Sequence, residues 1–293
     1  MSELPCPILS VVVCTRNRLG KLKRCVDALR SVAAARDWEL VIVDNGSTDG
    51  TGDYLASIDQ THFNRARVTT TFLPTRGLAA ARNKGWRTAS GEIVAFTDDD
   101  CYVSRDYVDA VVQVFDDDLN VGFLSGRILL FDALDYRITI QESQRRREFR
   151  PWTFIAAGAV QGANLAFRRT VLERIGGFDE RLGAGTPFGC EDIDAAAATL
   201  WSGVVGAYDP RPVVFHHHGR RTEREAQELM RSYDAGRGAY YAKYILRRSS
   251  RSAYVSAWMR SIRNECVEAL RRGRVPRRSL TELSSALRFA LQR

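Results

Sequence analysis

The sequence predicts an α/β fold in which helices flank a mostly parallel central sheet, followed by a helical appendage at the carboxyl terminus. Short apolar, β-branched runs alternate four times with stretches of helical periodicity. Polar clusters rich in Asp follow several of these runs, as expected where parallel strands end at a ligand-binding edge. A basic segment with helically spaced apolar residues then closes the chain.

The first 118 residues contain the alternation. Apolar runs predict strands over 8–14, 39–43, 67–73 and 92–97. Helical spacing or an Ala-rich composition predicts helices over 19–35, 47–58, 77–88 and 104–115. Ser47 is the expected N-cap of the second helix, because a serine hydroxyl accepts a hydrogen bond from a free N–H at a helix start.

Residues 119–220 have a less regular pattern. The charged segment 141–150 is expected at the surface, and the Gly-rich segment 183–189 is expected to be a flexible loop. The remaining strands are predicted over 121–130, 162–168 and 213–215, and the helices over 170–175, where glycines stop the helix, and 191–202.

Length and charge divide the chain into a body, 1–220, and a tail, 221–293. The tail holds 17 Arg and Lys against 7 Asp and Glu, a net charge of +10, whereas the whole chain carries +8. The body is therefore slightly acidic, at −2, and is not expected to bind nucleic acid. We predict two or three amphipathic helices in the tail. One of them has an apolar stripe of Val255, Trp258, Met259, Ile262, Cys266 and Leu270.

Two absences in the sequence point to a cytoplasmic protein. No stretch reaches the ~18 apolar residues of a membrane span, and residues 1–7 do not resemble a signal peptide. The six cysteines form no CxxC pair, so we expect free and mostly buried thiols.

The run Asp98-Asp99-Asp100 follows the fourth predicted strand directly. Three carboxylates at the end of a buried strand are costly unless a cation lies beside them, since each unpaired buried charge costs several kcal/mol. Mg²⁺ and Mn²⁺ favour such hard oxygen ligands. The run therefore predicts a divalent metal that holds a phosphorylated substrate, with an exposed acidic turn as the alternative.

Three further clusters have the chemistry of a site. Thr15-Arg16 and Asp44-Asn45 also follow predicted strands, so they are expected at the same sheet edge as the acidic run. Glu191 and Asp192 begin a helix, where the dipole favours negative charge. His216 and His218 share one face of a strand, and imidazole is a common ligand of manganese-like ions.

Eight segments in order along the chain resemble one known family. They are SVVVCTRNR (10–18), VDNGSTDG (43–50), RGLAAARNKG (76–85), DDD (98–100), GANLAF (162–167), GGFD (176–179), EDID (191–194) and VVFHHH (213–218). Together they resemble the glycosyltransferases of the GT-A fold, specifically inverting family 2. The resemblance implies a Rossmann-like sheet, a nucleotide-diphosphate sugar donor and single-displacement sugar transfer. It also divides the body into a nucleotide-sugar-binding half, about 1–118, and an acceptor-binding half, about 119–220.

The resemblance assigns the donor-binding residues. Thr15 and Arg16 would border the nucleotide, and Asp44 would accept a hydrogen bond from the base or, alternatively, cap its own turn. Arg76 and Arg82 would face the ribose or the diphosphate, with a solvated helix position as the alternative for Arg82. Asp98 would lie near the ribose and Asp99 would support it. Cys14 departs from the family, which usually has proline there.

The resemblance also assigns the reacting groups. Asp100 would bind Mn²⁺ or Mg²⁺ together with His216, or with His218 in its place. Asp192 would be the general base that deprotonates the acceptor hydroxyl, and Glu191 would hold neighbouring groups or touch the acceptor. Segments 131–160 and 183–190, where members of the family select their acceptors, match nothing recognisable. The acceptor therefore stays open between a glycan, a lipid-linked glycan and a small molecule.

Two alternatives to this function remain open from the sequence. One is a sugar nucleotidyltransferase, although 14–18 lacks the glycine-rich loop of that class and the chain has only four lysines. The other is a catalytically silent sugar-nucleotide-binding subunit of a polysaccharide-assembly complex. For the tail, we expect either peripheral docking on the anionic inner membrane face or a helical cap or homodimer interface.

Overall fold

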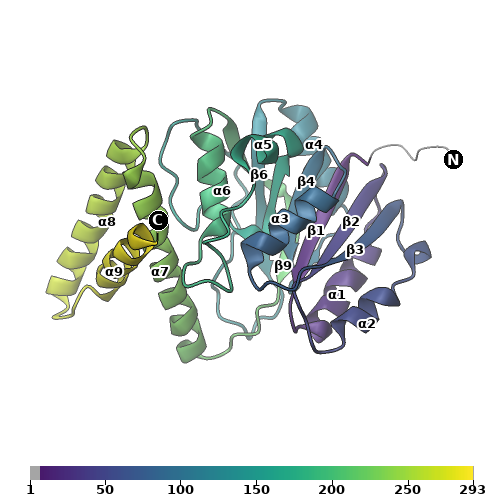
Figure 1. The fold of residues 1–293 in the computed structure, drawn as a ribbon, viewed down its shortest axis with the longest axis horizontal. Helices are drawn as coiled ribbons and strands as arrows, with labels where there is room; N and C mark the ends of the chain where they lie inside the picture. The colour runs from purple at the N-terminus through teal and green to yellow at the C-terminus, as the bar shows by residue number, and fades with distance from the viewer. Residues whose placement is uncertain (1–6, 293) are drawn as a thin grey trace.

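The computed structural model describes residues 7–292 of the chain and contains one nine-stranded sheet. The strands follow the order β3-β2-β1-β4-β8-β6-β9-β5, with β7 paired to β9. Figure 1 shows the sheet with helices on its faces and the three carboxyl-terminal helices grouped at one side. The predicted α/β class with a helical appendage is confirmed.

The amino-terminal half of the sheet is parallel, as predicted. It consists of β1 (Leu9–Thr15), β2 (Trp38–Asp44), β3 (Ala66–Phe72) and β4 (Ile93–Asp98). β1 pairs with β2 so that Thr15 lies opposite Asp44, and with β4 so that Cys14 lies opposite Asp98. This register brings the polar ends of three strands to one edge.

The second half of the sheet is mixed. β6 (Val121–Leu130) and β9 (Val205–His216) are parallel to each other. Three shorter strands, β5 (Cys101–Val103), β7 (Arg147–Phe149) and β8 (Leu165–Arg168), pair antiparallel with their neighbours. The predicted strand at 162–168 is split, because 162–164 forms the 3₁₀ helix η2 (Gly162–Asn164).

The prediction for 213–215 was too short, because the strand begins at Val205. The strand accommodates Pro210 and Pro212, which cannot donate to a ladder. They lie at a register shift between the pairs Ser125–Tyr208 and Arg127–Val213, where the ladder is irregular. The segment 141–150 is largely exposed as predicted, but Phe149 on β7 is buried.

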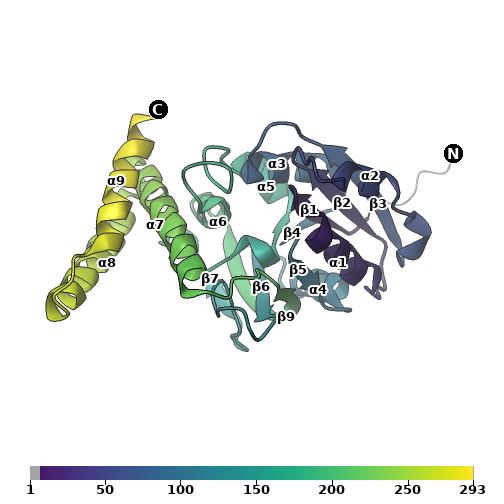
Figure 2. The ribbon, with the colours of Figure 1, turned by 90° about the horizontal axis from the view of Figure 1, so that it is seen from below.

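Side chains alternate along β1 and build two hydrophobic clusters. Val11 and Val13 join a cluster with α1 (Leu19–Arg30), α2 (Thr51–Ala56) and α4 (Tyr107–Asp117). Val12 faces the opposite cluster with α3 (Leu78–Thr88), α5 (Arg169–Ile175) and α6 (Glu191–Leu200). Figure 2 shows α3 and α5 on one side of the strands, with α1 and α4 on the other.

Three helix boundaries differ from prediction by three residues or more. α1 ends at Arg30 instead of continuing to 35, and α4 begins at Tyr107 instead of 104. α2 begins at Thr51 after Gly50, so Ser47 is not its N-cap. Ser47 belongs to the preceding turn, where its N–H donates to Asp44 Oδ1 at 2.8 Å. The remaining short element is η1 (Gln60–His62).

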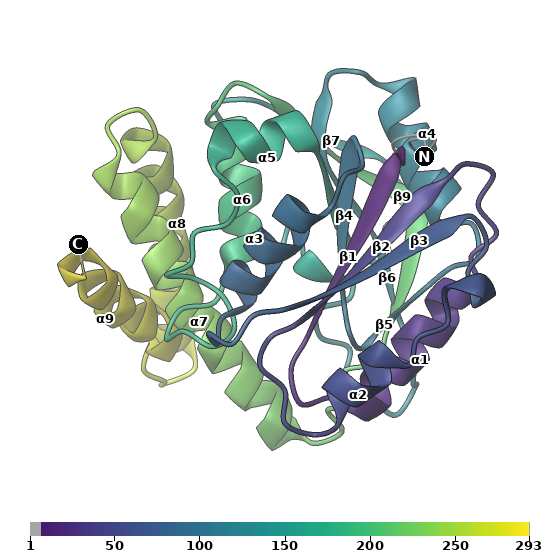
Figure 3. The same cartoon turned by 45° about the vertical axis from the view of Figure 1, so that its right-hand side comes forward.

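The tail forms α7 (Glu223–Leu246), α8 (Arg251–Arg271) and α9 (Arg277–Leu291). Tyr240 and Tyr244 of α7 belong to the same buried cluster as α3 and α6, so α7 packs directly on the body. α7 and α9 approach so closely that a Cβ on Gly238 would lie 2.1 Å from the carbonyl oxygen of Glu282. Figure 3 shows α8 and α9 beyond α7, away from the sheet.

In the described part of the chain, no helix combines the length and apolar character needed to cross a bilayer. The five described cysteines are free, as predicted: Cys25 and Cys101 are buried, Cys14 and Cys190 are half-buried, and Cys266 is exposed. Cys6 lies outside the described residues.

Candidate active site

A cavity of about 630 Å³ opens at the carboxyl edge of the parallel strands. Residues from β1, β4, α3, α6, β9 and α7 line it, together with the loops around 157–163 and 183–190. Every site residue predicted from the sequence lies on this cavity except Asp44 and His218. Those that do are Thr15, Arg16, Arg76, Arg82, Asp98, Asp99, Asp100, Glu191, Asp192 and His216.

The acidic run projects three carboxylates to different partners. The half-buried Asp98 contacts Arg82, with 3.1 Å between Oδ1 and Nη2. Asp99 is 2 % exposed and accepts from the Thr15 hydroxyl at 2.8 Å, and burial raises its pKa to about 6. Although burial opposes it, contact with His216 and Arg18 lowers the pKa of Asp100. The run is thus a buried charged cluster, not an exposed acidic turn.

Two cations that the sequence analysis did not single out neutralise this cluster. The guanidinium of Arg18 bridges Asp99 Oδ1 at 2.6 Å and Asp100 Oδ2 at 2.7 Å. Lys21 Nζ lies 3.2 Å from the same Asp100 oxygen and donates to the carbonyl oxygen of His217 at 3.0 Å. Arg18 lies within the segment 10–18 that carries the family resemblance, whereas nothing in the sequence marked Lys21.

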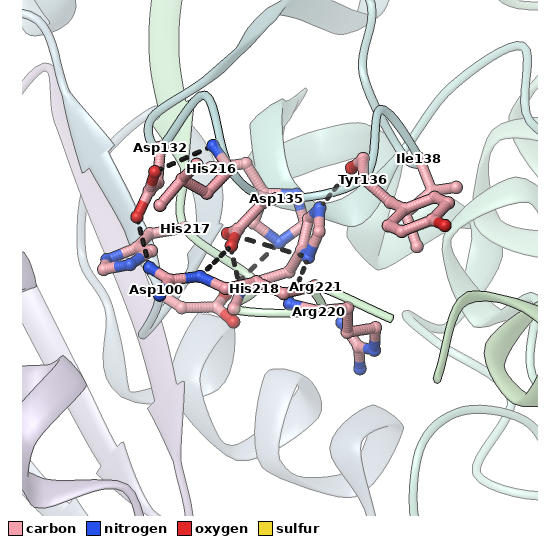
Figure 4. A network of polar contacts seen from close by, with 12 residues as sticks. Asp100, Asp132, Asp135, Tyr136, Ile138, His216, His217, His218, Arg220 and Arg221 are labelled. Atoms are coloured by element: carbon pink, nitrogen blue, oxygen red, sulfur yellow. Dashed lines mark hydrogen bonds and ion pairs between the residues drawn. The ribbon is translucent and has the colours of Figure 1, made fainter. Parts of the chain in front are cut away.

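The pairing of β5 with β9 brings Asp100 to His216. Cys101 lies opposite His216 in the ladder, and His216 Nε2 lies 3.5 Å from Asp100 Oδ1. One ligand atom each from Asp100, Cys101 and His216 lies within 4.8 Å of the others. A carboxylate with an imidazole suits Mn²⁺ well, so these residues fit the predicted metal. Figure 4 shows Asp100 beside the histidine segment.

The other two histidines are engaged elsewhere. His218 Nε2 lies 2.8 Å from the carbonyl oxygen of Tyr136, and its Nδ1 accepts from the N–H of Arg220 at 3.0 Å (Figure 4). Both ring nitrogens are therefore used within the protein, and His218 is not available as the alternative metal ligand. His217 Nδ1 lies 3.0 Å from the hydroxyl of Tyr102.

Arg82 is buried and connects two acids of the cavity. Its Nη1 lies 2.6 Å from Glu191 Oε1 and its Nη2 lies 3.1 Å from Asp98 Oδ1. Arg82 is only 3 % exposed, so it is not a solvated helix residue. A Cβ at Gly162 would lie 2.3 Å from Nη2, so glycine is needed there for the guanidinium to fit. Burial raises the pKa of Glu191 to about 7 even with Arg82 beside it.

Asp192 lies beside this pair at the first turn of α6. Its Oδ2 accepts from the N–H of Gly162 at 2.8 Å, and its Oδ1 accepts from the N–H of Ile193 at 2.7 Å. These bonds fix the carboxylate at the cavity wall. Burial raises the pKa of Asp192 above its ordinary value, and the charge of Asp98 adds to this effect. Asp192 is therefore a stronger base than an ordinary aspartate.

The predicted nucleotide-binding residues have different surroundings. Arg16 Nη1 donates to the carbonyl oxygen of Gly46 at 2.9 Å, and Arg76 is exposed at the cavity. Asp44 is 4 % exposed and accepts a hydrogen bond from the N–H of Ser47. In the structure Asp44 therefore caps its own turn, which was the alternative role. Asn45, which the sequence analysis assigned no role of its own, lines the cavity and accepts from the N–H of Gly77 at 3.0 Å.

The tail contributes to the cavity as well. Leu229, Met230, Tyr233 and Arg237 of α7 line the wall that faces the loop 183–190. No motif in the sequence marked these residues, because amphipathic spacing does not reveal what a helix face covers. The division at 220/221 remains a prediction, but α7 forms part of both the core and the cavity.

We expect Arg18→Ala to strengthen Mn²⁺ binding to the protein without nucleotide by roughly fivefold, because a competing cation is removed from Asp99 and Asp100. Titration of free Mn²⁺ by electron paramagnetic resonance measures this. Lys23→Ala removes an exposed charge from α1, the helix that follows Arg18, and is the control. Unchanged or weaker Mn²⁺ binding by Arg18→Ala would contradict the competition.

The mostly parallel sheet with helices on both faces is that of the GT-A fold. Residues 10–176, more than half of the chain, match the family described as Glycosyl transferase family 2, and the chain belongs to this family.

Curated relatives of the chain are named as glycosyltransferases. Validoxylamine A glucosyltransferase of Streptomyces hygroscopicus subsp. jinggangensis is 38% identical over 109 residues, which cover 36% of this chain and 25% of the relative. Pre-mycofactocin glycosyltransferase of Mycobacterium tuberculosis is 26% identical over 223 residues, covering 72% of this chain and 43% of the relative. The chain thus matches less than half the length of these two relatives.

Solved structures with the same fold come from two further proteins. The mannosyltransferase PcManGT from Pyrobaculum calidifontis, in complex with GDP-Man and Mn²⁺, superposes with a TM-score of 0.64 at 22% identity, covering 98% of this chain and 88% of that one. S. aureus TarS 1-349 in complex with UDP gives a TM-score of 0.56 at 18% identity, covering 78% and 65%. At these identities the likeness establishes the fold.

Proposed function

We propose that this protein is a metal-dependent, inverting glycosyltransferase that moves a sugar from a nucleotide-diphosphate sugar to an acceptor hydroxyl. One observation carries the proposal. The carboxylate of Asp192 is fixed by two backbone N–H groups and has a raised pKa, and it lines the same 630 Å³ cavity as Asp98, Asp100 and His216. A base and a metal-binding pair on one cavity are the groups that a single displacement at an anomeric carbon requires.

The donor would lie along the ends of β1 and β4. Asp98 and the exposed Arg76 both line the cavity, where Asp98 would contact the ribose and Arg76 the diphosphate. Asp100 and His216 would hold Mn²⁺ or Mg²⁺, which stabilises negative charge on the departing nucleoside diphosphate. Asp44 would need to turn away from Ser47 or use its second oxygen to contact the base. The similar structures that hold GDP-Man or UDP support a nucleotide-diphosphate donor.

The displacement itself would use Asp192. Its carboxylate accepts the proton of the acceptor hydroxyl as that oxygen bonds to the anomeric carbon and the bond to the diphosphate breaks. Glu191 forms an ion pair with Arg82 at 2.6 Å and would hold this guanidinium in the cavity wall. A single displacement inverts the anomeric configuration and leaves no covalent sugar on the protein.

The acceptor would enter between the loop 183–190 and α7. Leu229, Met230 and Tyr233 make this wall partly apolar, while Arg220 adds positive charge. An acceptor with an apolar portion and an anionic group, such as a lipid-linked glycan, suits this wall better than a neutral free glycan.

We expect one nucleoside diphosphate to raise the thermal midpoint of the protein, and to do so more in the presence of Mn²⁺. A ligand that binds only the folded state stabilises it by mass action, by about 2.7 kcal/mol at a hundred times its Kd. The panel includes UDP and GDP, each with and without Mn²⁺, and Asp100→Ala should lose the metal-dependent part of the shift.

The same panel separates the proposed enzyme from a silent sugar-binding subunit. For the selected nucleotide, the corresponding nucleotide sugar is incubated with Mn²⁺ and a sugar acceptor, and release of the nucleoside diphosphate is followed. Binding without any release, with acceptors that include lipid-linked glycans, would favour the silent subunit. The absence of a thermal shift with every nucleotide would contradict both.

A further inference from the structure

Helix α9 is amphipathic, but its leucines face solvent. Leu280, Leu283, Leu287 and Leu291 follow one another at spacings of three and four residues, so they form a single stripe. Their exposed fractions are 53, 41, 68 and 84 %. The buried side of the helix instead carries Ser279, Glu282, Ser285, Ala286 and Phe289.

Polar contacts lock α9 in this orientation. Glu282 is fully buried and accepts from Arg237 of α7 at 2.8 Å and from the indole N–H of Trp258 of α8 at 2.9 Å. Glu265 of α8 accepts from the N–H groups of Arg278 and Ser279 at 3.0 and 2.8 Å, which satisfies the start of α9. Turning the leucines inward would break all of these bonds.

Helix α8 and the turn after it extend the apolar surface. Met259 is 58 % exposed, Leu270 is 84 % exposed, and Val275 in the turn is 61 % exposed. We call the leucine stripe of α9 together with Met259, Leu270 and Val275 the outer face. Seven large apolar side chains exposed on two consecutive helices and the turn between them are typical of an interaction site. Exposed arginines accompany it at positions 260, 263, 271, 274 and 277.

We propose that the outer face docks on the surface of an anionic phospholipid bilayer. Leucines on one side of a helix with arginines nearby are the composition of interfacial helices, whose apolar side chains enter the acyl region while the cations meet lipid phosphates. Charge complementarity selects this partner, because the tail carries +10. A second copy docked face to face would bring two such tails together, and their like charges would repel.

The inner side of α9, opposite its leucine stripe, contacts a loop of the cavity. Phe289, on the inner side of α9, packs edge-on against Phe188 with 5.5 Å between ring centroids. Phe188 belongs to the loop whose residues 183–187 line the cavity. Docking would therefore hold the cavity close to the bilayer, where a lipid-linked acceptor would be presented; this last step rests on the proposed function.

The test is co-sedimentation of the full chain with vesicles of phosphatidylcholine alone or mixed with phosphatidylglycerol, at low and high salt. We expect binding to the mixed vesicles only, and weaker binding at high salt. The double variant Leu287→Gln, Leu291→Gln should bind about tenfold or more weakly, since two apolar side chains no longer enter the lipid. The variant Arg271→Gln should lose roughly fivefold.

The matched control is Leu119→Gln, because Leu119 is 77 % exposed on the body. Equal binding by this control and the wild type supports the outer face as the docking surface. Absence of binding to the mixed vesicles, or equal binding by the double variant, would overturn the proposal. So would light scattering that shows a dimer which the double variant converts to a monomer. The thermal midpoint with nucleoside diphosphates is measured on the same variants. An unchanged response to nucleotide alongside lost vesicle binding shows that the docking surface and the proposed function are tested separately.

Discussion

Asp192→Asn is expected to lower the rate of sugar transfer by about a hundredfold to ten-thousandfold, the usual contribution of a general base. The amide cannot accept the proton of the acceptor hydroxyl, although it has nearly the shape of the carboxylate. Binding of the nucleoside diphosphate and of Mn²⁺ should stay close to that of the wild type, because Asp192 is not among the groups that would hold the donor. Steady-state transfer rates and thermal shifts measure the two effects separately.

The pH dependence gives a second readout of Asp192. A base must be ionised, and burial raises the pKa of Asp192 above the ordinary 3.8. We therefore expect kcat/KM to fall as the pH drops, with the acid limb above the range of a solvated aspartate. The residual activity of Asp192→Asn should lack this limb.

The control for Asp192→Asn is Asp53→Asn, an exposed acid in the first turn of α2 that lies away from the cavity. It should transfer sugar at the wild-type rate. If Asp192→Asn retained more than about a tenth of that rate, which is well above what loss of a base permits, another group would be the base. Glu191 would then be the next candidate.

Arg82→Met is expected to lower the free energy of unfolding by about 3–5 kcal/mol, the typical cost of removing one member of a buried ion pair. Glu191 would lose its partner at 2.6 Å and remain buried, and Asp98 would lose its contact at 3.1 Å. Methionine keeps an unbranched apolar stem but removes the guanidinium, including its contact with the ring of Phe178, so the loss reports mainly the charged group. Urea unfolding followed by circular dichroism measures the difference.

The pH dependence of this loss has a defined sign. Burial raises the pKa of Glu191 from 4.5 to about 7 in the folded protein, so its ionisation costs stability as the pH rises through that range. Without Arg82 the ionisation of Glu191 costs more stability, because the positive charge that partly offsets its burial is gone. The difference between Arg82→Met and the wild type should therefore be small well below pH 7 and should grow toward and above it.

Two further variants test the buried-pair explanation. Arg82→Met combined with Glu191→Gln should recover part of the lost stability, because no buried carboxylate then lacks a partner. Arg36→Met removes an ion pair of 2.8 Å with Asp116 in which both side chains are about half exposed, and it should cost about 1 kcal/mol or less. A double variant as unstable as Arg82→Met alone would contradict this explanation.

Local pattern was enough to predict much of the site. The strands that end at Thr15, Asp44 and Asp98 are apolar runs followed at once by polar residues, and parallel strands present such ends at one edge. Glu191 and Asp192 were recognisable as two acids at the start of a predicted helix, where the dipole favours negative charge. The family resemblance then supplied the roles that spacing alone does not contain.

Contacts between distant segments were not predictable from pattern. Asp100 meets His216 only because the three-residue strand β5 pairs with β9, and a strand that short has no detectable periodicity. Arg18 and Lys21 lie on or beside α1, where helical spacing gives no indication that they reach Asp99 and Asp100. Their role depends on how α1 packs against β5.

The tail shows the same division most clearly. The sequence alone determined that 221–293 is basic, helical and amphipathic, because charge and the 3.6-residue period are local properties. Only the tertiary structure decided which face is covered. Glu282, held by Arg237 and Trp258, turns the polar side of α9 inward and leaves its leucines in solvent. Those contacts join residues on three different helices, and a pattern read along one helix contains no record of them.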